Sequence, residues 1–193
     1  MLFKGLRPKL KINKSLVCFV LIIVSVFACG FGLNFIQKNV IYKTEYNEYV
    51  DKYSDEYNVD KALIYSVIKC ESSYDESAVS SVGAIGLMQI TPETFDWMLS
   101  KTGEKYTHDD LYKPEINIKY GTYLLSLHTE EFADLKTALC AYHAGRGIVN
   151  EWLNNNNYST DGLTLTNIPY KATASYAQRV IKTVDKYKNI YGF

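Results

Sequence analysis

Glu71 is the residue of this sequence best suited to transferring a proton. It ends an apolar helical pattern in which Leu63, Val67 and Glu71 recur four residues apart and so share one face of a helix. A carboxyl group in apolar surroundings has a raised pKa, because burial disfavours its ionised form. Such a group keeps its proton near neutral pH, as a general acid must. The ordinary alternative is a helix-terminal glutamate that points into solvent.

Small residues and an amide follow this acid. Gly83, Ala84 and Gly86 allow a loop backbone to approach a bound molecule closely, because they carry little or no side chain. Gln89 carries an amide that can bridge backbone groups or sugar hydroxyls. The string Ala-Tyr-His-Ala-Gly at 141–145 adds an aromatic ring. An acid that faces a glycine-lined loop and an aromatic turn suits a carbohydrate cleft.

Helices must position these residues. Apolar residues recur at helical spacing, and no segment after residue 54 alternates apolar and polar residues for long. Asp60 can cap the helix that carries the acid, and Thr91 followed by Pro92 is typical of another helix start. The expected helices are about 46–57, 61–71, one from 92 onward, 114–129, 135–143, 147–153 and 169–191. We therefore predict an all-α domain with one core. Residues 162–166 have strand composition, so the stretch 154–167 has room for a small hairpin.

A long apolar segment precedes this domain. Residues 16–36 contain no charged side chain, and about 20 apolar residues are enough for a helix to cross a bilayer. Five basic residues and no acidic ones come before it, a bias that holds the N-terminus in the cytoplasm. We expect a single-pass protein of the cell membrane with a cytoplasmic segment 1–15, an anchor 16–36, a linker 37–44 and an extracytoplasmic domain 45–193.

The sequence leaves two alternatives to an uncleaved anchor. A cleaved signal peptide also begins with basic residues, but its apolar region spans only about 7–15 residues, and no small-x-small cleavage site is evident here. A lipoprotein signal would end at Cys29, but Phe27 fits that pattern poorly and apolar residues continue to Ile36. The length of the apolar run favours the anchor over both.

Charge and cysteine content restrict the partners of the domain. The chain has 21 basic and 21 acidic residues, and five of the basic ones precede the anchor, so the domain is mildly acidic. Nucleic acid is therefore not an expected partner, whereas a neutral glycan needs no basic patch. No cysteine or histidine spacing is typical of a metal site, and we expect neither metal nor cofactor. Cys70 and Cys140 could form a disulfide in an oxidising compartment, but two buried thiols are favoured.

Six motifs in order resemble those of lytic transglycosylases with the soluble-lytic-transglycosylase (SLT) catalytic domain. They are Glu71-Ser72, residues 83–89 ending in Gly86-Leu87-Met88-Gln89, Pro92-Glu93-Thr94, Pro114-Glu115-Ile116-Asn117-Ile118, Ala141-Tyr142-His143-Ala144-Gly145, and Ile168-Pro169 through Tyr176. The resemblance covers about residues 45–190. It implies a lysozyme-like helical fold, similar to goose-type lysozymes, and peptidoglycan glycan strands as substrate. It also implies Glu71 as the catalytic residue and these residues in contact with the glycan: Ser72, Met88, Gln89, Tyr142, His143 and Tyr176.

The last motifs depart from the family pattern at three positions. His143 stands where the family usually has Asn, which keeps a hydrogen-bonding side chain but alters its reach. Ala172 and Ala174 stand where the family has Glu and Arg, which removes an ion pair able to position the last helix. Neither departure removes the acid, so activity is still expected.

The resemblance implies a reaction that uses one carboxyl group twice. Glu71 protonates the oxygen between N-acetylmuramic acid and N-acetylglucosamine, while the substrate's 2-acetamido group supports the charge at the anomeric carbon. Glu71 then removes the proton of the muramoyl 6-hydroxyl, which closes a 1,6-anhydro ring. Only Asp75 and Glu76 follow closely as further acids, in an expected loop, and no motif supports either as a nucleophile. The alternatives are hydrolysis, as in goose-type lysozymes (muramidases), and a non-catalytic glycan-binding module.

Overall fold

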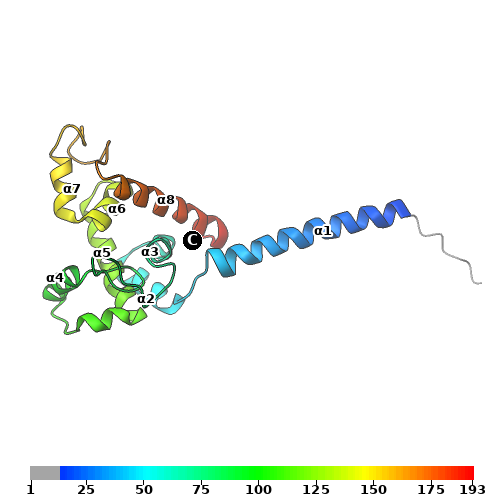
Figure 1. Ribbon diagram of the computed structural model, residues 1–193, viewed down its shortest axis with the longest axis horizontal. Coiled ribbons are helices and arrows are strands. Elements are labelled where there is room, and N and C mark those ends of the chain that lie inside the picture. Colours follow the sequence, from blue (N-terminus) through cyan, green and yellow to red (C-terminus); the bar gives the residue numbers. More distant parts are fainter. Residues whose placement is uncertain (1–13) are drawn as a thin grey trace, which may run out of the picture. The chain divides into compact units, whose positions relative to one another are not determined.

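The computed structural model describes residues 14–193. These residues divide into two compact units, one that ends at Lys43 and one that spans Thr44–Phe193. The second unit is all-α, as predicted (Figure 1). Its helices are α2 (Asn47–Tyr57), α3 (Lys61–Glu71), α4 (Pro92–Thr102), the short 3₁₀ helix η2 (His108–Tyr112), α5 (Pro114–Glu131), α6 (Leu135–Ala144), α7 (Arg146–Leu153) and α8 (Lys171–Tyr191).

The first unit is one continuous helical segment over its described residues up to 41. α1 (Lys14–Ile36) runs into a π-helical stretch, Gln37–Ile41, so helix extends into the predicted linker. Within it, Leu21–Ile41 has a mean hydropathy of 1.6 and is long and apolar enough to cross a membrane. Large side chains such as Phe27 and Phe31 are exposed. Residues 1–13 of the predicted cytoplasmic segment lie outside the described residues.

Local sequence explains where the helix that carries Glu71 begins and ends. Asp60 caps α3, since its Oδ1 accepts a hydrogen bond from the Ala62 N–H at 2.8 Å. The helix ends at Glu71 because Ser73 and Tyr74 have φ angles of 54° and 71°, in the left-handed region that a right-handed helix cannot contain. The acid therefore occupies the last position of a helix whose residues 62–68 are buried.

The core of the domain lies between α3, α5, α6 and α8. α3 packs on α8, α6 packs on both α5 and α8, and α2 packs on α5. The predicted apolar stripe of α3 is buried against these neighbours: Leu63, Ile64, Val67 and Ile68. Because burial of each such side chain contributes roughly 1.5–3 kcal/mol, this stripe fixes α3 firmly in place. The end of α3 is thereby held at a defined position.

The predicted hairpin within 154–167 is wrong. The structure has turns and bends there, organised by the carboxylate of Asp161. Its Oδ1 accepts hydrogen bonds from the backbone N–H groups of Leu163 and Thr164, each at 2.8 Å. These bonds hold the pKa of Asp161 well below its usual range, with the Thr164 N–H as the largest cause. Backbone donors that a strand would need are thus used locally.

Cys70 and Cys140 are free thiols, as predicted, but Cys70 is half-buried and only Cys140 is buried. Cys140 is fully buried, and burial raises the pKa of its thiol to about 11. The Sγ of Cys70 lies 3.7 Å from the Thr183 hydroxyl on α8. A thiol that stays protonated reacts slowly, so Cys140 serves the packing of α6.

Candidate active site

Glu71 is half-buried at the end of α3, and its carboxyl group has the electrostatics of a proton donor. Burial raises its pKa to about 7, while the Tyr176 hydroxyl and the positive charge of Arg179 pull the pKa down. The predicted shift is confirmed in direction and cause. No second carboxylate is among the groups that shift this pKa. Near neutral pH the group exists in both protonation states, as a residue that donates and then accepts a proton requires.

Tyr176 and Arg179 of α8 approach Glu71 from the neighbouring helix. Tyr176 is 1% exposed, and burial next to Glu71 raises the pKa of its phenol well above the ordinary value. Its hydroxyl faces Glu71 without the geometry of a full hydrogen bond, and no other described residue pairs with it. The Cζ of Arg179 lies 5.8 Å from the centroid of the Tyr176 ring. The sequence prediction missed Arg179, although its spacing of three from Tyr176 puts both on one helix face.

Ser72 and Gln89 hold the loop that follows the acid. The Ser72 hydroxyl donates to the Leu87 carbonyl at 2.9 Å and so ties the end of α3 to the far end of the loop. The Gln89 amide donates to the carbonyls of Ala78 and Gly86, at 3.1 and 2.9 Å. Both side chains are half-buried. Of the two options for Gln89, backbone bridging is the one that the structure contains.

Asn117 on α5 forms hydrogen bonds from its side chain to the backbone of this loop. It is fully buried, and its Nδ2 donates to the carbonyls of Ile85 and Leu111 at 2.9 and 2.7 Å. Its Oδ1 accepts from the Met88 N–H at 2.7 Å. Gly86 passes directly over this amide with a φ of +75°, and a Cβ there would collide with the Asn117 side chain. The sequence showed Asn117 within a motif but did not single it out.

The burial of Met88 contradicts the prediction that its side chain contacts the glycan. Its side chain has no exposed area and packs against Gly121 of α5, so closely that a Cβ on Gly121 would overlap it. A side chain buried in this way fills the core and does not line the cleft. Its backbone carbonyl still takes part in the site, because it accepts a hydrogen bond from the Tyr142 hydroxyl at 2.7 Å.

Tyr142 and His143 bring the end of α6 to the same place. Tyr142 is close enough to Glu71 for that carboxylate to help raise the pKa of its phenol, after the larger effect of burial. The His143 ring is tilted against Tyr176, with centroids 4.6 Å apart, and its Nδ1 lies 3.1 Å from the Thr173 hydroxyl. The structure thus gathers Glu71, Tyr142, His143 and Tyr176 from three helices.

Asp75 and Glu76 are exposed and engaged elsewhere. The Asp75 carboxylate accepts from the hydroxyl and the N–H of Ser77 at 2.7 and 2.9 Å. Glu76 accepts from the Tyr46 hydroxyl at 3.2 Å. Neither carboxylate therefore supplies a second acidic group next to Glu71. Among the described residues, no group of three or more His, Cys, Asp or Glu is placed to hold a metal ion.

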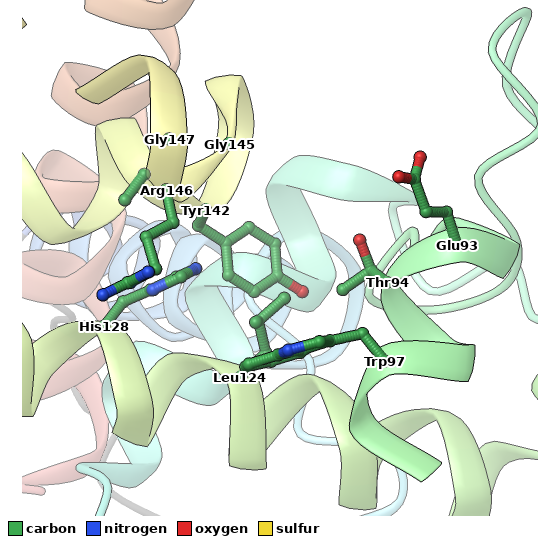
Figure 2. Close-up of a pocket in the computed structure, with 10 residues that line it drawn as sticks. Glu93, Thr94, Trp97, Leu124, His128, Tyr142, Gly145, Arg146 and Gly147 are labelled. Atoms are coloured by element: carbon green, nitrogen blue, oxygen red, sulfur yellow. The ribbon is translucent and has the colours of Figure 1, made fainter. Parts of the chain in front are cut away.

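A pocket of about 500 Å³ adjoins Tyr142 (Figure 2). It is lined by residues of α4, α5 and the α6–α7 junction: Glu93, Thr94, Trp97, Leu124, His128, Ala141, Tyr142, Gly145, Arg146 and Gly147. The sequence prediction missed Trp97, His128 and Arg146. Arg146 directly follows a recognised motif, and Trp97 lies one turn after Thr94, but His128 is marked by no pattern in the sequence.

Comparison with known proteins finds the same domain elsewhere. The family model of the transglycosylase SLT domain matches residues 48–163. The chain is 29% identical over 155 residues to the soluble lytic murein transglycosylase of Salmonella typhimurium, covering 76% of this chain and 23% of the relative. It is 31% identical over 164 residues to the membrane-bound lytic murein transglycosylase C of Glaesserella parasuis, covering 73% of this chain and 45% of the relative. It thus spans less than half the length of these relatives.

A solved structure has the same fold. The 70 kDa soluble lytic transglycosylase of Escherichia coli aligns with a TM-score of 0.69 at 25% identity, covering 78% of this chain and 25% of that one. A shared fold therefore explains both the order of the helices and the motifs around Glu71. Because the family model matches more than half of its residues, this chain belongs to the transglycosylase SLT domain family.

Proposed function

We propose that this protein is a membrane-anchored lytic transglycosylase that cleaves peptidoglycan glycan strands. The observation that carries the proposal is the single half-buried carboxyl group of Glu71, with a pKa raised to about 7 and no second carboxylate acting on it. A retaining hydrolase with an enzymic nucleophile needs two carboxyl groups about 5 Å apart. The membership of the SLT family supports the same chemistry.

In the proposed mechanism Glu71 first acts as an acid and then as a base. It protonates the glycosidic oxygen between N-acetylmuramic acid and N-acetylglucosamine, and the resulting carboxylate is stabilised by the charge of Arg179 and the hydroxyl of Tyr176. That carboxylate then accepts the proton of the muramoyl 6-hydroxyl as the 1,6-anhydro ring closes. We assign glycan contacts to the accessible groups of the site, namely Ser72, Gln89, Tyr142 and His143, with Tyr176 beside Glu71.

Digestion of purified glycan strands followed by mass spectrometry tests this proposal. A lytic transglycosylase gives products that are lighter by one water than those of a hydrolase, because the anhydro ring forms without water. Products that carry this water would support a muramidase instead. Binding without any product would support a glycan-binding module.

The activity is expected to decrease as the pH rises through about 7. Glu71 must be protonated to act as an acid, and its pKa is raised to about 7, so the protonated fraction is high at pH 6 and small at pH 8. The measurement is kcat/KM on soluble glycan strands between pH 5 and 9. A profile that keeps rising above pH 8 would contradict the role of Glu71 as the proton donor.

We further propose that the helix containing Leu21–Ile41 anchors the protein and that the domain lies outside the cytoplasm. Its length, its hydropathy and the basic residues before it support this orientation. We expect the mature protein to keep its N-terminus and to stay in the membrane fraction through a high-salt wash. A soluble form that lacks the first 30 to 40 residues would instead indicate a signal peptide. Acyl labelling that disappears in Cys29→Ala would indicate a lipoprotein.

A further inference from the structure

His143 lies in the last turn of α6 and contacts α8 at two places. Its Nδ1 lies 3.1 Å from the hydroxyl of Thr173, and the centroid of its ring lies 4.6 Å from that of the Tyr176 ring. Thr173 and Tyr176 are three residues apart on α8 and therefore lie on the same face of that helix. His143 thus connects the end of α6 to the part of α8 from which Tyr176 approaches Glu71.

Tyr176 is the residue through which this contact reaches Glu71. Its side chain is 1% exposed, so its ring moves only if the side chains packed around it move. Burial raises the pKa of Glu71, and the Tyr176 hydroxyl acts in the opposite direction because it stabilises the ionised carboxylate. That stabilisation depends on the distance and the angle between the two groups. A contact that fixes the Tyr176 ring therefore also fixes the acid strength of Glu71.

The start of α8 has few other side-chain groups that could hold it in place. Tyr170, which precedes the helix, provides no side-chain cap for its first N–H groups. Ala172 and Ala174 carry only methyl groups. Thr173 between them is 2% exposed, and the hydroxyl of this buried residue lies against His143. The contact with His143 is thus placed where α8 needs a fixed position relative to α6.

Titratable or charged groups face Tyr176 from three helices: Glu71 and Cys70 of α3, Tyr142 and His143 of α6, and Arg179 of α8. Burial lowers the pKa of His143, and the positive charge of Arg179 lowers it further. The imidazole is therefore mainly neutral at pH 7, since its ordinary pKa is already about 6.5. It packs against Tyr176 as an uncharged ring and does not compete with Arg179 for the charge of Glu71.

We propose that His143 is a positioning residue, which fixes the Tyr176 phenol against Glu71 by bridging the end of α6 and the first turns of α8. This role adds to the glycan contact assigned to His143 above. The inference rests on the proposed function, because it concerns the proton that Glu71 transfers. The His143 side chain is exposed, so its replacement leaves the buried core of the domain intact.

Turnover of purified glycan strands by the full-length His143→Ala variant tests this role between pH 5 and 9. Without the ring, the Tyr176 phenol is free to withdraw from Glu71. We expect kcat to fall about tenfold or more while KM changes by less than about threefold. The fall of kcat/KM near pH 7 should move to higher pH, because Glu71 loses a group that stabilises its carboxylate. A raised KM with unchanged kcat and an unchanged pH profile would overturn the proposal.

Two further variants separate the ring contact from a general effect of losing a histidine. His143→Phe keeps a flat ring against Tyr176, and its kcat should stay within about threefold of that of the unmodified protein. His108→Ala is the matched control, because His108 is also exposed and pairs with Asp96 at 2.9 Å, away from Tyr176. Its kcat should stay within about twofold. Equal losses in His143→Ala and His143→Phe would refute the ring contact.

A double-mutant cycle shows whether His143 acts through Tyr176. Tyr176→Phe removes the hydroxyl, so this variant alone should also move the fall of kcat/KM to higher pH. Adding His143→Ala should then produce no further movement, because the group that His143 positions is already absent. Additive movements would mean that His143 acts on Glu71 by another route and would overturn the proposal.

Melting temperatures test the same inference without turnover. The difference in stability between a protein and its Glu71→Gln variant depends on pH through the pKa of Glu71. Because that pKa is raised on folding, the stability contributed by Glu71 is lost as the pH rises through it. In the His143→Ala background, this loss should continue to higher pH. An unchanged pH dependence would refute the role of His143 alone. Absence of anhydro products from the unmodified protein, with the pH dependence shifted as expected, would refute the proposed reaction alone.

Discussion

Replacement of Glu71 by Gln is expected to slow release of anhydro products by a factor of about 10²–10⁴. The amide keeps the size of the side chain but has no proton to transfer. Turnover of purified glycan strands by the full-length protein is the measurement. Asp75→Asn and Glu76→Gln are the matched controls, because both residues are exposed and acidic and lie within five positions of Glu71. Each should stay within a few-fold of the unmodified protein.

The same variant should gain stability relative to the unmodified protein as the pH rises. The pKa of Glu71 is raised on folding to about 7, so its contribution to stability is fully present below its unfolded pKa and is lost as pH rises through about 7. Glu71→Gln has no ionisable group at this position, so its stability has no such pH-dependent contribution. The difference in melting temperature between the two proteins should therefore favour the variant more at pH 8 than at pH 4.

Near-normal turnover by Glu71→Gln, or an equal loss of turnover in Asp75→Asn or Glu76→Gln, would contradict the role assigned to Glu71.

Asn117→Leu is expected to reduce the free energy of unfolding by about 3–5 kcal/mol. The substitution leaves the Met88 N–H and the carbonyls of Ile85 and Leu111 buried without their partner. Each loss of a buried hydrogen bond of this kind costs about 1–3 kcal/mol. Denaturant unfolding of the full-length protein measures the change.

Activity should fall further in Asn117→Leu than the folded fraction alone explains. Asn117 holds the loop that Ser72 ties to the end of α3, so a loosened loop no longer fixes the surroundings of Glu71. Asn156→Ala is the control, since Asn156 is exposed in the loop after α7. Its stability should change by less than about 0.5 kcal/mol. A stable, fully active Asn117→Leu protein would show that the loop does not depend on this amide.

The helices and their beginnings could be predicted from the sequence because they depend on near neighbours. Asp60 caps α3 and Thr91 caps α4 through bonds to N–H groups two and three residues later. The apolar stripe of α3 also predicted the raised pKa of Glu71, because a residue four positions after a buried residue shares its environment. These features do not require knowledge of which helix packs against which.

Features that depend on distant segments were decided by the tertiary structure. Met88 is in the core because Gly121 of α5 leaves room for its side chain, a contact between residues 33 positions apart that no local pattern shows. Residues 162–166 have strand composition, but the single carboxylate of Asp161 uses the backbone donors that a hairpin needs.

The pairing of α3 with α8 decided the surroundings of Glu71 in the same way. It places Tyr176 and Arg179 beside the carboxyl group although more than 100 residues of chain separate them. The sequence by itself predicted Glu71 as the proton donor and placed it at the end of a helix. Tertiary packing determined which groups adjust its pKa and which pocket adjoins it, because electrostatic and steric effects depend on distance in space and not on position along the chain.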